Sequence, residues 1–103
     1  MKIRVERDKI IKAVKKLEEI EIVLDNAGDA KEAIDLILRK TSFIKVEFYE
    51  KVKDIAVTAS QEYKTSSVDY NTIFTLEFNF EEDTAVESKV AFIRDLQDFF
   101  NKL

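Results

Sequence analysis

The chain contains no cysteine, histidine, proline or tryptophan, and it has one glycine. Without cysteine there can be no disulfide, thiol nucleophile or thiolate metal site. Without histidine there is no imidazole base for hydrolysis, no histidine ligand for zinc and no proton shuttle of the usual kind near neutral pH. No glycine-rich phosphate loop or calcium-loop spacing is present. Carboxylate, lysine and tyrosine chemistry stays open, but we expect a protein that is not an enzyme and uses no cofactor or metal.

Long apolar runs are also missing. No segment approaches the roughly 20 apolar residues that span a bilayer, and no signal-peptide pattern opens the chain. The length of 103 residues, with 46% apolar and 37% charged residues, is typical of one folded domain. We therefore expect a single soluble, acidic domain over residues 1–103, located in the cytoplasm and not bound to membranes.

Charge is distributed unevenly along the chain. The net charge is −4, yet residues 1–16 carry +5 and the remainder carries −9. The lysines of the first expected helix form a candidate basic patch: Lys9, Lys12, Lys15 and Lys16. This patch could steer a partner or a second copy of the chain, or it could be only the solvated face of the helix. The acidic body opposes phosphate contacts and no aromatic residues interleave with the lysines, so we do not expect nucleic-acid binding.

The stretch 68–80 carries the clearest structural signal. Every second residue from Val68 to Phe80 is apolar or threonine, which is the period of a half-buried strand. Residues 44–48 and 55–59 alternate in the same way. Because the connections are short, residues 42–81 predict an antiparallel β-meander of three strands. The alternation of charged and aliphatic residues over 1–6 predicts an edge strand that would make a fourth.

Residues 8–40 predict a helical hairpin. Asp8 stands at a helix-capping position ahead of Ile10 and Val14, which are spaced as on one helical face. The segment 19–25 is ambiguous, because its apolar residues alternate as in a strand and also continue the helical spacing. We prefer the helix and keep the strand as the alternative.

The turn of this hairpin is expected at Asp25–Gly28. Gly28 suits the left-handed position after a helix, where a Cβ would be unfavourable, and Asp29 followed by Glu32 suits the start of the next helix. The stretch from Gly28 to Ile34 resembles the turn between the paired helices of a tetratricopeptide repeat. No second copy follows at that family's period, so the resemblance implies a helix–turn–helix hairpin and not a solenoid.

Residues 84–103 predict a C-terminal helix. Thr84 with Glu87 matches the capping box. The expected apolar stripe consists of Val86, Val90, Phe92, Ile93, Leu96, Phe99, Phe100 and Leu103. The predicted fold is therefore a two-layer α+β domain. A helical hairpin and a C-terminal helix pack on one face of a three- to four-stranded antiparallel meander.

The sequence marks surfaces rather than chemistry. Phe43, Tyr49 and Ile73 are expected on the outward face of the sheet, where they could form a docking patch or the seam of a homodimer. A sheet edge is the other candidate, since exposed strands pair with further strands. We interpret the chain as a non-catalytic protein-interaction module that binds a protein partner or itself. The alternative is a small-ligand-binding domain with an apolar, phenylalanine-lined pocket between sheet and helices.

Overall fold

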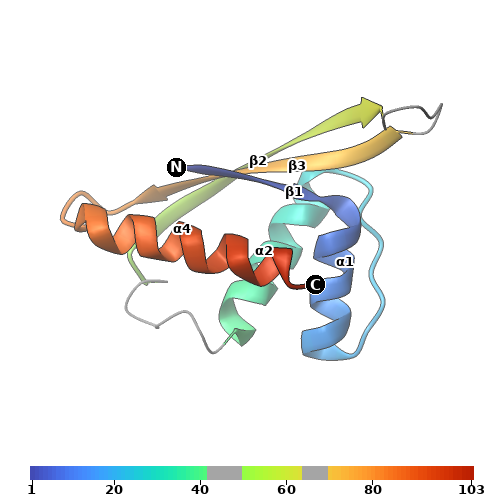
Figure 1. Cartoon of the computed structure of the whole chain (residues 1–103), viewed down its shortest axis with the longest axis horizontal. Coiled ribbons are helices and arrows are strands. Elements are labelled where there is room, and N and C mark those ends of the chain that lie inside the picture. The colour runs from blue at the N-terminus through green and yellow to red at the C-terminus, as the bar shows by residue number, and fades with distance from the viewer. Residues whose placement is uncertain (42–49, 64–69) are drawn as a thin grey trace.

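The computed structural model describes residues 1–41, 50–63 and 70–103, and three helices and three strands lie within them (Figure 1). In chain order these elements are β1 (Lys2–Glu6), α1 (Arg7–Glu18), α2 (Ala27–Lys40), β2 (Val52–Tyr63), β3 (Tyr70–Phe80) and α4 (Val86–Asn101). The strands form one antiparallel sheet, and these helices pack together on one of its faces (Figure 1). The predicted α+β fold is confirmed.

β3 is the central strand of the sheet, whose order is β1-β3-β2. β1 pairs with β3 in a register that places Ile3 opposite Leu76, and β2 pairs with the other side of β3, with Val57 opposite Leu76. Residues 2–6 thus form an edge strand where the sequence predicted one. The strand expected at 44–48 lies outside the described residues. Because β1 lies beside β3, the described strands do not follow one another in chain order as in a simple meander.

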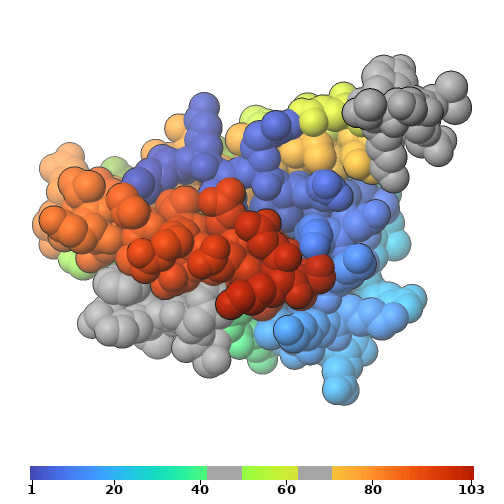
Figure 2. Space-filling model, in the orientation of Figure 1, coloured from blue at the N-terminus to red at the C-terminus, as the bar shows by residue number. Residues whose placement is uncertain are grey.

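The core lies between the sheet and the helices. On β3, Phe74, Leu76 and Phe78 are buried, whereas Thr75 and Glu77 between them are partly exposed, as the alternation predicted. The helices contribute most of the remaining core: Ile10, Ala13, Val14, Ala30, Ala33, Ile34, Ile37, Leu38, Phe92, Leu96 and Phe100. Leu24, together with Ile3 and Val5 of β1 and Ile55 of β2, completes it. Figure 2 shows α4 lying across the near side of the molecule, over β1 and α1.

The helical hairpin exists, but its turn differs from the prediction. α1 ends at Glu18, and Glu19 adopts a positive φ of 57° while its N–H donates to the carbonyl oxygen of Lys15. Residues 20–25 are neither helix nor strand. Gly28 lies inside the first turn of α2 and has no positive φ, so the expectation that it ends the first helix is wrong.

Asn26 explains why α2 begins where it does. Its side-chain Oδ1 accepts a hydrogen bond from the Asp29 N–H at 2.9 Å, and Asp29 Oδ2 accepts one from the Asp25 N–H at 2.9 Å. The first bond satisfies a backbone donor that the first turn of a helix leaves free, and the second joins the residue before the cap to the same turn. An asparagine cap two residues before Gly28 therefore places the glycine in the helix.

Replacing Asn26 with alanine is expected to lower the free energy of unfolding by about 1 kcal/mol, because the Asp29 N–H loses its acceptor. Urea denaturation followed by circular dichroism measures the change. Asn26→Ser is the control, since serine also caps helices well. Equal destabilisation by both variants would show that the side-chain cap does not hold this helix end.

The start of α4 also differs from the prediction. The helix begins at Val86 with Ala85 at the cap and no side-chain hydrogen bond there, so the predicted capping box of Thr84 and Glu87 is wrong. The preceding residues instead form a turn closed by the Thr84 N–H donating to the Glu81 carbonyl oxygen at 3.0 Å. Val86 and Val90, which were expected in the apolar stripe, are exposed on α4.

Candidate functional site

Only part of the predicted outward patch lies in the described structure. Phe43 and Tyr49 lie outside the described residues. Ile73 is on the outward side of β3, because it alternates with the inward Phe74, but only 8% of it is exposed. Ile73 therefore offers a partner little surface, and a shared docking patch of these three residues stays a prediction.

An ion pair crosses the outward face of the sheet at Ile73. Arg4 of β1 forms a charged hydrogen bond with Glu62 of β2, so the contact spans the central strand. Arg4 lies opposite Thr75, and Glu62 lies opposite Asn71. Since Ile73 lies between these two positions on β3, the ion pair crosses the outward side of Ile73.

Apart from Ala56, the rest of the described outward face is polar. Lys2 lies 4.0 Å from Glu77 on the neighbouring strand. The Asn79 side chain donates a hydrogen bond to Asp54 Oδ1 at 2.6 Å. Exposed polar contacts of this kind contribute little to stability. Their presence is typical of a sheet face that meets water.

The predicted basic patch divides into two parts. Lys9 Nζ donates to the main-chain oxygen of Leu103 at 2.6 Å, and Lys15 pairs with Glu21 at 3.5 Å. Lys12 and Lys16 are exposed and have no ion-pair partner among the described residues. Lys9 and Lys15 thus make contacts within the chain. Of the four lysines, only Lys12 and Lys16 leave unpaired positive charge on α1 in the described part of the chain.

No metal centre or catalytic carboxylate pair emerges from the described residues, which hold no group of three or more metal-ligating side chains. Lys51 and Asp83 have shifted pKa values and lie 2.7 Å apart near the turn between β3 and α4. The hydrogen bond from Lys51 lowers the pKa of Asp83, and the same bond raises the pKa of Lys51. Both groups reach solvent, so this is a surface ion pair that fastens the turn.

The outer edge of β2 is the first candidate site. In the described part of the chain, β2 is paired on one side with β3, and no strand pairs with its other side. The stretch Ile55–Gln61 has no charged residue. From Thr58 to Glu62 every side chain is exposed, including those on the inward side, because this end of the hairpin extends beyond the helices (Figure 1).

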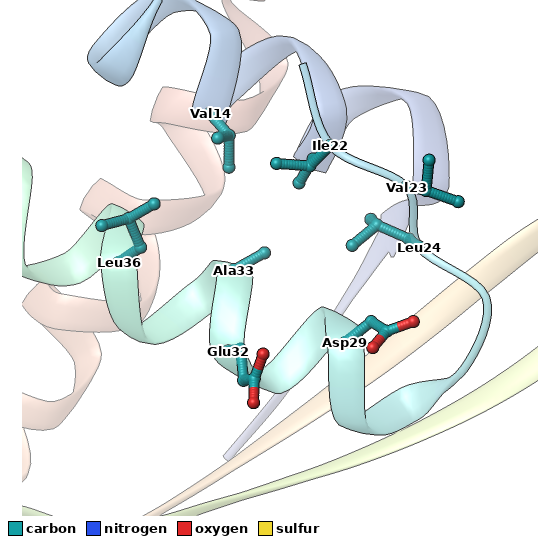
Figure 3. A pocket seen from close by; sticks show the side chains of 8 residues that line it. All are labelled: Val14, Ile22, Val23, Leu24, Asp29, Glu32, Ala33 and Leu36. Atoms are coloured by element: carbon teal, nitrogen blue, oxygen red, sulfur yellow. The ribbon is translucent and has the colours of Figure 1, made fainter. Parts of the chain in front are cut away.

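The second candidate site is an apolar pocket between α1 and α2, which we call the α1–α2 groove (Figure 3). Its volume is about 210 Å³. The lining residues come from α1, the 20–25 segment and α2: Val14, Ile22, Val23, Leu24, Asp29, Glu32, Ala33 and Leu36. In Figure 3 the apolar side chains of Val14, Ile22 and Leu24 point toward the space between the two helices. The groove therefore has an apolar floor with carboxylates beside it.

Hydrogen bonds hold the wall of this groove in place. The Arg7 guanidinium Nε donates to the Leu24 carbonyl oxygen at 3.0 Å, which attaches the 20–25 segment to the start of α1. The contact between the Asp25 N–H and the Asp29 carboxylate attaches its other end to α2. The segment is thus a fixed wall although it contains no regular secondary structure.

The sequence predicted neither the groove nor its position. The apolar residues of the 20–25 segment, Ile20, Ile22 and Leu24, fitted both a strand and a continued helix, and neither interpretation places a pocket beside them. The alternative interpretation, a small-ligand-binding domain, placed phenylalanines around a pocket between sheet and helices. Phe74, Phe78 and Phe92 instead are buried within the packed core.

Comparison with known proteins gives no relative: no family model, curated protein or solved structure matches the chain. Of the helices in the described ranges, none is both long enough and apolar enough to cross a membrane. Function has to be argued from the two surfaces above.

Proposed function

We propose that this chain is a non-catalytic protein-interaction module that forms a homodimer through the outer edge of β2. Pairing of two β2 strands would join two three-stranded sheets into one continuous sheet. The observation that carries the proposal is the open, uncharged edge of β2 among the described residues.

The composition of this edge supports pairing. Natural sheets protect exposed edges with charges, proline or bulges. In β2 the irregularity between Val52 and Asp54 and the charged residues near it lie at one end, and Glu62 lies at the other. The seven residues from Ile55 to Gln61 carry no such protection, and main-chain groups along an unpaired edge favour a further strand.

The sequence of β2 also favours one antiparallel register. A two-fold axis at Val57 would pair the strand over nearly its whole length and place Ala56 opposite the partner subunit's Thr58. No like charges then face each other. An axis one residue further, at Thr58, would place Asp54 opposite the partner subunit's Glu62, and like charges at directly opposite positions destabilise a sheet.

Two double variants test this register. Ala56→Lys with Thr58→Lys places lysines opposite lysines twice across the axis, whereas Ala56→Lys with Thr58→Glu places lysines opposite glutamates. Each cross-strand pair contributes about 0.2–1 kcal/mol, so the dimer dissociation constants of the variants are expected to differ by about tenfold or more. Both positions are exposed on the outward face, so neither pair of changes alters the core.

Light scattering behind a sizing column, over a wide concentration range, measures the effect. The unchanged protein and the Lys/Glu variant are expected at twice the 12.0 kDa of the chain, and the Lys/Lys variant as a monomer. Thermal melts followed by circular dichroism check that both variants fold. A strict monomer for the unchanged protein would refute the proposal. Equal dimer dissociation constants for both variants would show that the interface is not the outer edge of β2.

A further inference from the structure

We propose that the α1–α2 groove binds a large aliphatic side chain of a partner peptide that carries lysine or arginine beside it. The groove shares no lining residue with β2. This site is therefore separate from the dimer edge, and the inference stands whether or not the chain self-associates.

The size and lining of the groove fit one aliphatic side chain. Val14, Leu24 and Ala33 form a buried floor, while Ile22 and Leu36 are partly exposed and lose further contact with water when a ligand enters. The volume of about 210 Å³ exceeds that of the engineered apolar cavity of roughly 150 Å³ that accepts benzene. A leucine- or isoleucine-sized group therefore has both the room and the apolar contacts it needs.

Exposed apolar residues continue the groove outward. Val23 lines the pocket and is 68% exposed, and Ile20 on the same segment is also exposed. A small side chain alone would leave these residues in water, whereas a peptide backbone crossing the mouth of the groove would cover them. Their position favours a peptide over a small molecule.

The charge around the groove selects for a basic partner. Asp29 and Glu32 line the pocket itself. Of the six carboxylates in residues 18–32, Glu21 and Glu18 pair with Lys15 and Lys40, whereas Glu32 has no ion-pair partner in the described part of the chain. A negative rim attracts lysine and arginine and repels a carboxylate. Fatty acids and acidic peptides are thereby disfavoured.

The groove is also preformed. Arg7 and Asp29 hold the 20–25 segment by the hydrogen bonds described above. A binding surface that is already ordered loses less conformational entropy on association. A short peptide can therefore bind measurably although the contact is small.

Titration of the full chain with synthetic peptides, followed by amide chemical shifts in NMR spectra, tests the inference. The probe is acetyl-KKIAIKK-amide, and the controls are acetyl-KKAAAKK-amide and acetyl-EEIAIEE-amide. The probe is expected to bind at least tenfold more tightly than either control, with shifts concentrated in residues 20–36. Binding should weaken as salt rises, since exposed charges are screened beyond about 10 Å at 0.1 M ionic strength.

Matched variants separate the groove from general attraction to an acidic protein. Glu32→Lys is expected to weaken probe binding at least tenfold, whereas Glu87→Lys on α4 makes the same charge change outside the groove and should leave binding within twofold. Val23→Ser should weaken the probe and leave acetyl-KKAAAKK-amide unaffected. Light scattering of each variant records its oligomeric state.

Several results would overturn the inference. Equal weakening of probe binding by Glu32→Lys and Glu87→Lys would show that the probe binds by non-specific charge attraction. Equal binding of the probe and the alanine peptide would show the same. Equal binding of acetyl-EEIAIEE-amide would make the groove a site for apolar groups of any charge. A dimer that dissociates on Glu32→Lys would assign the groove to a second copy of the chain, independently of the result at the β2 edge.

Discussion

Replacing Phe92 with alanine is expected to lower the free energy of unfolding by about 3–5 kcal/mol. Phe92 of α4 is 1% exposed. Its ring meets Phe78 edge-to-face at 5.2 Å between centroids and 71° between planes, and it meets Phe80 at 5.5 Å and 86°. Alanine would remove the burial of the ring, leave a cavity at the contact of helix and sheet, and abolish both aromatic pairs.

Two further variants separate these contributions. Phe92→Leu keeps most of the apolar volume but loses the edge-to-face geometry, which contributes about 0.5–1.5 kcal/mol per pair beyond burial, so its effect should be clearly smaller. Val90→Ala changes an exposed side chain of the same helix and is expected to alter stability by less than about 0.5 kcal/mol. Urea denaturation of all three proteins gives the free energies. A loss for Phe92→Ala no larger than that for Val90→Ala would contradict the packing of α4 on the sheet.

The faces of β3 were predictable because strand geometry repeats with the period of the sequence. Alternation identified Phe74, Leu76 and Phe78 as buried and Thr75 and Glu77 as outward. That prediction needs no knowledge of the partner strands, since any apolar layer would bury the same side of β3. The order of the strands in the sheet could not be predicted, because pairing β1 beside β3 or beside β2 satisfies the same alternation.

Residues 19–25 show where periodicity fails. Ile20, Ile22 and Leu24 fit a strand and, in part, a helix, and the segment is neither. Local hydrogen bonds decide the outcome: Glu19 closes α1 in a left-handed conformation and Asn26 caps α2. A single turn-forming glycine is a weaker signal than a side chain that can accept the first backbone donors of a helix.

The two candidate surfaces were predictable to different degrees. An open sheet edge follows from any small sheet, so it was expected, although the identity of the edge depends on the order β1-β3-β2. The α1–α2 groove arises where Val14, Leu24 and Ala33 come together from three segments. Each of these residues alone has the pattern of ordinary core, and only the tertiary arrangement leaves a space between them.

Deletion of α4 has the largest expected effect: a chain that lacks residues 84–103 should not fold cooperatively. α4 buries Phe92, Leu96 and Phe100, which together contribute about 5–9 kcal/mol by burial. A domain of this size is stable by only about 5–15 kcal/mol, and the deletion also uncovers the apolar side of the sheet.

Circular dichroism melts and urea titration of the truncated chain measure this loss, which should appear as a broad transition without a baseline for the folded state. Val86→Ser with Val90→Ser is the control, because it changes the exposed side of α4 and keeps every buried contact. A synthetic peptide of residues 84–103 added in trans is expected to restore a cooperative transition, since the missing contribution is side-chain burial and not chain connectivity. A sharp melt of the truncated chain alone would refute the prediction, because the sheet, α1 and α2 would then form a sufficient core without α4.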